Sequence, residues 1–269
     1  MSMDQTSTRR IVVNADDYGY TTGVSEGIRQ AFLAGTLSST TAMMNIPGAE
    51  EAVRLAQREI PEMAIGAHLV LTFGRPVSAP GDVPSLVRPD GSFHSLGEFT
   101  ENLDRIDPVD AIREWSAQIR KLSDLGVTVD HIDSHHHSSY LHPRLAQAML
   151  EVARLFDLPV RVPPDPPESH PSAPALFAAA TDVRTLHRFI GDLMKGSSPA
   201  KFISLVEPLP PGEIAELMVH PAILDDALLA TSSYATPRAA ELQTLCDPSV
   251  RRFLATAGVA LTTFGLDAR

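Results

Sequence analysis

The chain has 269 residues, of which 43% are hydrophobic and 20% are charged, and its formal net charge at pH 7 is −11. This length suits one large domain, and the composition is ordinary for a globular protein with a substantial core. The negative charge disfavours nucleic acid and anionic membranes as partners, and it favours a neutral or cationic ligand or a metal ion.

Cysteine content and hydropathy exclude further classes of protein. Cys246 is the only cysteine, so neither an intrachain disulfide nor a cysteine-based zinc site can form. The apolar run after Arg9 and Arg10 ends at Asn14, which is too short for a signal peptide, and no run reaches the length of a membrane span. We therefore expect a cytoplasmic protein with no membrane partner.

Short β-branched or apolar runs recur along the chain and predict strands. They cover residues 11–15, 39–44, 64–70, 127–132, 159–162, 201–206, 215–219 and 259–263. Segments with helical spacing occupy most of the gaps, such as Ile112, Trp115, Ile119 and Leu122 before the fourth run. Alternating strands and helices indicate a parallel sheet.

The number of these units favours a barrel. Seven or eight β/α units suit closure, and no glycine-rich dinucleotide-binding loop follows the first strand. The expected fold class is α/β, a TIM-like β/α barrel of seven or eight parallel strands, either regular or distorted. We expect a flexible segment over residues 1–10 and a single barrel domain over residues 11–269. The stretch Val162 to Pro174 contains six prolines and predicts a long irregular βα loop.

Polar residues gather where the predicted strands end. They are Asp16 and Asp17 after the first run, His68 near the end of the third, residues 133–137 after the fourth, Arg161 at the end of the fifth and His220 after the seventh. In a β/α barrel the carboxyl ends of the strands meet at one mouth. These side chains are therefore expected to share one pocket.

Asp16 and Asp17 form a carboxylate pair directly after an apolar strand. Two close carboxylates repel each other unless a proton or a cation intervenes, so the pair suits one aspartate on a metal and the other acting as a base. A solvated turn is the alternative, because aspartate and glycine are common turn residues.

Four of the ten histidines lie between His131 and His137. Imidazole is the commonest transition-metal ligand, but adjacent side chains on an extended segment point to opposite faces. We therefore expect one ligand among His135, His136 and His137, with the others supporting it or contacting substrate.

Three further residues carry weaker signals. His68 interrupts an apolar strand, where a lone histidine is more often a core residue, but beside the two clusters it fits a metal ligand. One carboxylate and two imidazoles leave coordination positions for water and substrate. His220 is either a simple strand end or a general acid that protonates a leaving nitrogen. Arg161 fits an orienting residue, a substrate contact or a surface residue.

Six motifs in order resemble those of the YdjC-like carbohydrate deacetylases, a family that includes chitooligosaccharide deacetylases. They cover residues 13–19, 39–42, 66–72, 131–137, 161–163 and 216–221, and the resemblance runs from about Ile11 to Phe264. Two departures lie beside the mouth: Ser138 to Leu141 follow the histidine triplet, and His220-Pro221-Ala222 replaces His-Pro-Gly.

The resemblance implies a β/α barrel, one divalent ion (Mg²⁺ or Zn²⁺), and hydrolysis of N-acetyl groups on acetylglucosamine-containing oligosaccharides. By motif, the metal ligands would be Asp17, His68 and His135, the base Asp16 and the acid His220. Other polar residues are expected to support the site or bind substrate: Asp133, His136, His137, Arg161 and Tyr18. The resemblance is also compatible with a homodimer.

The sequence hypothesis is a metal-dependent hydrolase that removes N-acetyl groups from amino sugars, in which a metal-activated water attacks the amide carbonyl. Two alternatives stay open. A metal-dependent phosphoesterase on a β/α barrel would also use clustered histidines and aspartates, usually with two metals. A non-catalytic sugar-binding relative would keep the barrel without turnover.

Overall fold

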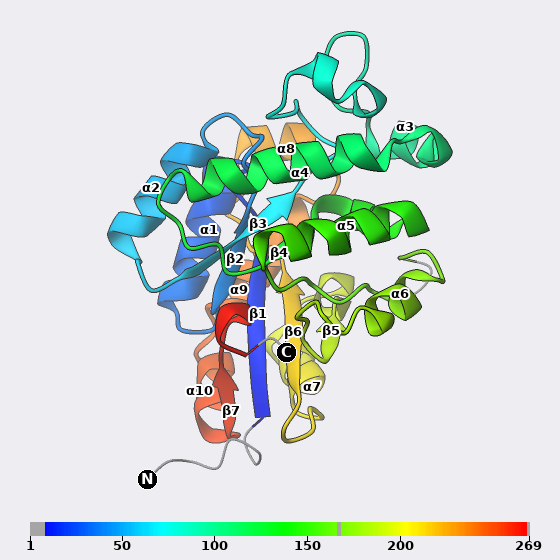
Figure 1. Cartoon of the computed structure of the whole chain (residues 1–269). Coiled ribbons are helices and arrows are strands. Elements are labelled where there is room, and N and C mark those ends of the chain that lie inside the picture. Colours follow the sequence, from blue (N-terminus) through cyan, green and yellow to red (C-terminus); the bar gives the residue numbers. More distant parts are fainter. Residues whose placement is uncertain (1–8, 166–167, 268–269) are drawn as a thin grey trace.

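The computed structural model of the chain describes residues 9–165 and 168–267, and its centre is a parallel sheet (Figure 1). Seven strands form this sheet in the described residues, namely β1 (Arg9–Tyr18), β2 (Ser39–Ala42), β3 (Ala64–Leu69), β4 (Ile132–Ser134), β5 (Arg188–Ile190), β6 (Ile214–Val219) and β7 (Val259–Leu261). Their order is β4-β3-β2-β1-β6-β5. β1 is long enough to pair with β7 near its start, with β2 near its end, and with β6 along its middle.

The sheet closes incompletely between β4 and β5. Val160 forms a single parallel bridge with Ile132, and its N–H donates to the carbonyl of Arg184, so one extended residue occupies the place of a strand. The predicted parallel β/α barrel is thereby confirmed, in its distorted form and with seven strands in the described part of the chain.

Helices surround the sheet, and Figure 1 shows α4 and α5 lying across it. The longer ones are α1 (Thr22–Leu33), α2 (Ala49–Glu59), α4 (Pro108–Ser123), α5 (Pro143–Phe156), α7 (Pro199–Val206), α9 (Thr236–Leu245) and α10 (Pro248–Thr256). The shorter ones are α3 (Leu96–Glu101), α6 (Ala173–Ala179), α8 (Asp226–Thr231) and α11 (Phe264–Asp267). None of the helices in residues 9–165 and 168–267 is both long and apolar enough to span a membrane.

The predicted strand over residues 201–206 is wrong, because this segment is helix α7. Its apolar residues are compatible with either structure, but the preceding residues begin a helix. The Ser198 side chain accepts a hydrogen bond from the Lys201 N–H, and Pro199 occupies the first helical position, which favours proline. Phe202 and Val206 then lie on the buried face.

Other predicted elements differ from the structure in their bounds, and one strand was missed. The fourth strand comprises residues 132–134 and not 127–132, and residues 159–162 contribute only the bridge at Val160. β5 was not predicted, because it has three residues and its first, Arg188, is exposed. The proline-rich loop ends before α6, whose first turn includes Pro174.

The structure describes only two residues of the predicted N-terminal segment 1–10. Arg9 and Arg10 belong to β1, whereas the rest of the predicted N-terminal segment, residues 1–8, lies outside the described residues. That residues 11–269 form a single domain stays a prediction.

Alternate residues of β1 enter two environments, as the two-residue period of a strand requires. Ile11, Val13 and Ala15 pack in the large core between the sheet and its helices. On the other face, Val12 belongs to a small apolar cluster with Leu186, Ile214 and Phe264, and the residues that follow it are Asn14 and Asp16, which are buried and polar. The interior of the barrel therefore changes from apolar to polar toward the carboxyl end of β1.

We expect Gly27→Ala to destabilise the fold by about 1–3 kcal/mol through overpacking. A Cβ at this position in α1 would lie 2.6 Å from the Ala222 Cα, a backbone atom that cannot move aside cheaply. Urea unfolding of both proteins measures the change. Gly97→Ala in α3 is the control, because its Cβ would meet nothing within 4 Å; equal stability of the two variants would contradict the prediction.

Candidate functional site

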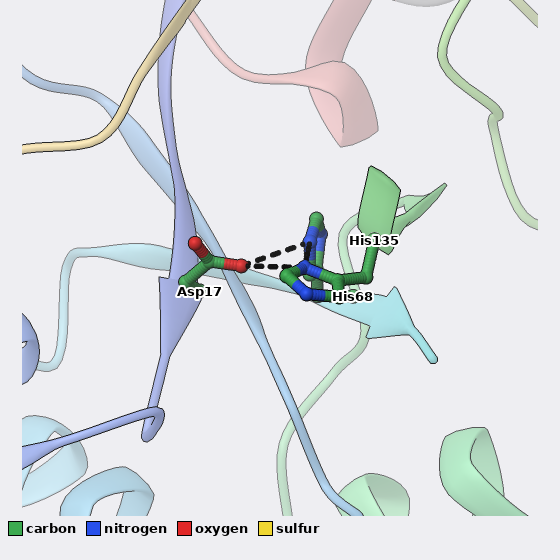
Figure 2. A group of neighbouring side chains, drawn as sticks. All are labelled: Asp17, His68 and His135. Atoms are coloured by element: carbon green, nitrogen blue, oxygen red, sulfur yellow. Dashed lines mark hydrogen bonds and ion pairs between the residues drawn. The ribbon is translucent and has the colours of Figure 1, made fainter. Parts of the chain in front are cut away.

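Asp17, His68 and His135 meet at the carboxyl ends of three strands (Figure 2). Asp17 Oδ1 lies 3.1 Å from His68 Nε2 and 3.0 Å from His135 Nδ1, and those two nitrogens are 3.2 Å apart. All three side chains are buried. One carboxylate oxygen and two imidazole nitrogens at this spacing are a donor set that fits zinc and related divalent ions.

The neighbours of His68 orient it for metal binding. Asp133 Oδ1 lies 2.8 Å from His68 Nδ1, and Thr41 donates a hydrogen bond to the other oxygen of Asp133. A carboxylate that holds the Nδ1 proton leaves the Nε2 lone pair facing Asp17 and His135, which is the usual support for a metal-ligating histidine.

The charge around His68 also favours a cation. Burial lowers the pKa of His68, but the carboxylates of Asp133 and Asp17 outweigh burial and raise this pKa to about 10. Without an ion the imidazole is therefore protonated at neutral pH. A divalent ion bound at Nε2 would take the place of that proton.

A second group of possible ligands, Asp16, His68 and Asp133, is less suited to an ion. Arg161 already contacts both of its carboxylates, Asp16 at 2.6 Å and Asp133 at 2.9 Å. The Nδ1 atom of His68 is likewise engaged by Asp133. The group that contains Asp17 and His135 is therefore the better candidate.

An irregularity near the end of β1 lets both aspartates line the same cavity. In a regular strand, neighbouring side chains would point to opposite faces. The register of β1 against β2 shifts between Ala15 and Tyr18, and Asp17 has a φ of 73°, in the left-handed region that non-glycine residues rarely adopt. Such strained positions cluster at functional sites.

The histidine triplet leaves the extended conformation at once. His136 and His137 have φ values of 56° and 52°, in the left-handed region, and form a kink after His135. All three rings line one cavity. Only His135 reaches Asp17; His136 contacts the Thr72 hydroxyl at 3.0 Å. Burial lowers the pKa of His136 and of His137 to about 3 each, which keeps both rings neutral.

Asp16 is held by Arg161 inside the barrel. The two carboxylate oxygens of Asp16 accept hydrogen bonds of 2.6 Å and 2.8 Å from the guanidinium, which also contacts Glu216 at 2.7 Å. Burial raises the pKa of Asp16, but the positive charge of Arg161 outweighs burial and places this pKa well below its ordinary value. Asp16 is therefore ionised at neutral pH and able to accept a proton.

His220 lies on the other side of Asp16, just after β6. Its Nε2 is 3.9 Å from Asp16 Oδ2, and its backbone N–H donates to Glu241 at 2.6 Å. The hydroxyl of Tyr234 donates to the other oxygen of Glu241, and the Tyr234 ring lies edge-on to His220. Burial lowers the pKa of His220, with the Arg238 charge acting in the same direction. The ring is therefore neutral at pH 7.

A cavity of about 590 Å³ contains these groups, within the range of small-molecule sites. Its described walls include two aspartates, the five histidines discussed above, and the apolar or aromatic side chains of Tyr20, Phe73, Leu96, Met194, Met218 and Tyr234. This mixed lining of polar and apolar groups suits a ligand with both kinds of surface.

Tyr18 lies away from the cavity, in contrast to its predicted place at the site. Its ring is buried in the main core, and its hydroxyl donates to the Ala52 carbonyl in α2. The irregularity in β1 turns Asp17 toward the mouth, whereas Tyr18 packs between the sheet and α2.

Sequence reasoning missed Arg238, Glu216, Thr41 and Glu241. Arg238 donates to Asp17 Oδ2 at 2.6 Å, yet it lies 221 residues away from it in the chain, within α9. Glu216 had one available signal, because a charged residue inside the apolar run of residues 215–219 must be paired if it is buried.

The chain is similar to one protein family and to curated proteins with one shared description. The family model described as YdjC-like protein matches residues 10–256. Among similar proteins are the carbohydrate deacetylases of Geobacillus stearothermophilus, 40% identical, and Brevibacillus brevis, 37% identical. Each alignment covers 95% of this chain, and 97% and 98% of those proteins, respectively.

A solved structure from Enterococcus faecalis, described as a proposed cellobiose-phosphate cleavage protein, is 31% identical and superposes with a TM-score of 0.90. The superposition covers 98% of this chain and all of that one. A match over most of the chain and relatives of this identity agree with the six motifs of the sequence, and the chain therefore belongs to the YdjC-like family.

Proposed function

We propose that this protein is a metal-dependent carbohydrate deacetylase that hydrolyses N-acetyl groups of amino sugars, with acetylglucosamine-containing chitooligosaccharides as the substrate class. The observation that carries the proposal is the buried cluster of Asp17, His68 and His135, with Asp16 and His220 on the wall of the same cavity. The names of the Geobacillus and Brevibacillus relatives support the reaction class.

The three ligands would hold one divalent ion, which when bound supplies Lewis acidity and lowers the pKa of water. Asp16 would act as the base, because Arg161 keeps its carboxylate ionised and fixed in place. His136 and His137 would contact the substrate as neutral rings. Asp133 would hold His68 in the orientation that ligation requires.

His220 would protonate the leaving nitrogen. Burial keeps the free His220 ring neutral, and a neutral imidazole is a weak acid, so His220 would gain a second proton during the reaction. Asp16 Oδ2 lies 3.9 Å from His220 Nε2, beyond direct hydrogen-bond reach, so one water would carry to the ring the proton that Asp16 takes. The base and the acid would thus act in sequence with a single proton.

A second candidate function has one observation in its favour. The Enterococcus faecalis structure is described as a proposed protein of cellobiose-phosphate cleavage, which suggests a phosphorylated disaccharide as substrate. Phosphoester cleavage usually requires basic groups for the phosphate and often two metals. Of the described residues that line the cavity, Arg238 is the sole arginine, and it is bound to Asp17. The deacetylase is therefore favoured. Cytoplasmic location and a homodimer stay predictions.

Metal binding should depend on Asp133 although it is not a ligand. Loss of a group that orients a ligand typically lowers metal affinity about 10–100-fold, so we expect this for zinc in Asp133→Asn. Competition with a chromophoric chelator measures the affinity, and elemental analysis should give one ion per wild-type chain. Asp182→Asn is the control, since Asp182 is exposed and pairs with Arg154. Equal zinc affinity of both variants would contradict the assigned support.

Zinc affinity should rise with pH. The pKa of His68 without an ion is about 10, so between pH 6 and 8 binding displaces its proton. For one displaced proton the apparent affinity rises about tenfold per pH unit, and it falls as pH decreases. Zinc titrations with a chelator of known proton affinity measure the slope. An affinity independent of pH would contradict a protonated His68.

Turnover should require both proposed proton carriers. We expect His220→Ala and Asp16→Asn each to lower kcat about 10²–10⁴-fold, the usual effect of removing a general acid or base. Acetate release from diacetylchitobiose and triacetylchitotriose measures activity, and bound metal should change little in His220→Ala. His142→Asn, outside the cavity, keeps a side chain able to cap α5 and serves as the control. Full activity of His220→Ala would contradict the role as acid.

A further inference from the structure

Arg238 is held at three points in the wall of the candidate site. Its Nη2 donates to Asp17 Oδ2 at 2.6 Å, and its Nε donates to the Tyr234 carbonyl at 2.8 Å. The guanidinium carbon lies 6.0 Å from the ring centre of Tyr20 and 5.8 Å from that of Tyr234. The side chain is only 4% exposed. This cation is therefore fixed in position before any ligand arrives.

The remaining nitrogen of Arg238 is unused. Nη1 is buried and finds no hydrogen-bond partner in residues 9–165 and 168–267, although Arg238 lines the cavity. By contrast, Arg161 uses Nε, Nη1 and Nη2 in hydrogen bonds. A buried charged donor without a partner is costly, and in native proteins such groups commonly await water, an ion or a ligand.

We propose that Arg238 is a substrate-binding residue whose Nη1 donates a hydrogen bond to the acetyl oxygen of the substrate. The inference rests on the proposed deacetylation. Because Asp17 is both a proposed metal ligand and the partner of Nη2, the free donor lies on the same arginine that contacts the metal site. Negative charge develops on the acetyl oxygen during hydrolysis, and a fixed, charged donor stabilises such charge most strongly.

Arginine is suited to this double task because its planar fork presents separate donors in fixed directions. A lysine has one nitrogen, which can pair with Asp17 but cannot also hold a second acceptor in the same geometry. The competing explanation is that Arg238 only positions Asp17. The two explanations differ in what happens to acetate, the product that retains the acetyl oxygen.

The test compares zinc and acetate affinity in Arg238→Lys and Arg238→Met. For Arg238→Lys saturated with zinc, we expect zinc affinity within about threefold of wild type and acetate affinity about 10–100-fold weaker, the usual effect of losing a charged hydrogen bond. Arg238→Met should lose affinity for both. Arg154→Lys, which alters an exposed arginine paired with Asp182, should change neither. Acetate affinity equal to wild type in zinc-saturated Arg238→Lys would overturn the inference.

A measurement on the wild-type protein guards against misfolding of these variants. With ¹⁵N-labelled arginine, the Arg238 Nη resonances, assigned by their loss in Arg238→Lys or by contacts to Tyr20 and Tyr234, should shift when acetate is added. Acetate that leaves them unmoved, or fails to bind, overturns the inference. An Arg238-dependent acetate site in a protein that releases no acetate from any chitooligosaccharide would instead sink the proposed function alone.

Discussion

Three buried carboxylates around one guanidinium form the interaction on which the rest of the structure depends. Arg161 contacts Asp16 of β1, Asp133 of β4 and Glu216 of β6, and it follows Val160, which forms a single bridge with Ile132 of β4. Side-chain ion pairs therefore join strands where backbone pairing is thinnest. Removing one partner of a buried ion pair typically lowers the free energy of unfolding by about 3–5 kcal/mol. The same ion pairs therefore stabilise the barrel and hold the side chains of the site.

Arg161 and its three carboxylates also carry a net negative charge near the carboxyl ends of the strands. A single guanidinium does not neutralise Asp16, Asp133 and Glu216, and the pKa of Glu216 is raised chiefly by burial. Against the effect of burial, the carboxylates of Asp133 and Asp16, together with Asp17, raise the pKa of His68, so the ring is protonated when no ion competes for it. A divalent ion bound there would compensate the same negative charge as that proton does.

Arg161 and Arg238 each bind one of the two adjacent aspartates. Arg161 binds Asp16 from inside the barrel, whereas Arg238 of α9 binds Asp17 from the mouth. The two adjacent aspartates, which line one cavity, thus differ in their arginine partners. Because α9 also carries Glu241, which holds the backbone of His220, one helix outside the sheet positions both the proposed metal ligand Asp17 and the proposed acid.

Local signals in the sequence were enough to predict most strands and the polar residues at their ends. The alternation of apolar runs with helical segments predicted the parallel barrel. Polar residues at strand ends predicted one shared pocket for Asp16, Asp17, His68, residues 133–137 and His220, because carboxyl ends of barrel strands converge in any such fold. The choice of His135 among the three histidines came from the family resemblance alone. Local sequence signals gave wrong or missing predictions where a segment fits two kinds of secondary structure or is very short. Residues 201–206 form α7 because Ser198 and Pro199 favour a helix start, and β5 is too short for a pattern.

Contacts between groups that are far apart in the chain became visible only in the folded structure. Arg238 meets Asp17 across 221 positions of sequence, and Glu216 meets Arg161 across 55, distances over which no periodicity carries information. The irregular end of β1 sent Tyr18 into the core while Asp17 turned toward the cavity, a choice made by the pairing with β2 and the packing of α2. Hydrogen-bond partners and orientation depend on the packed neighbours, which is why the local pattern predicted Arg161 near the site but gave no signal for Arg238.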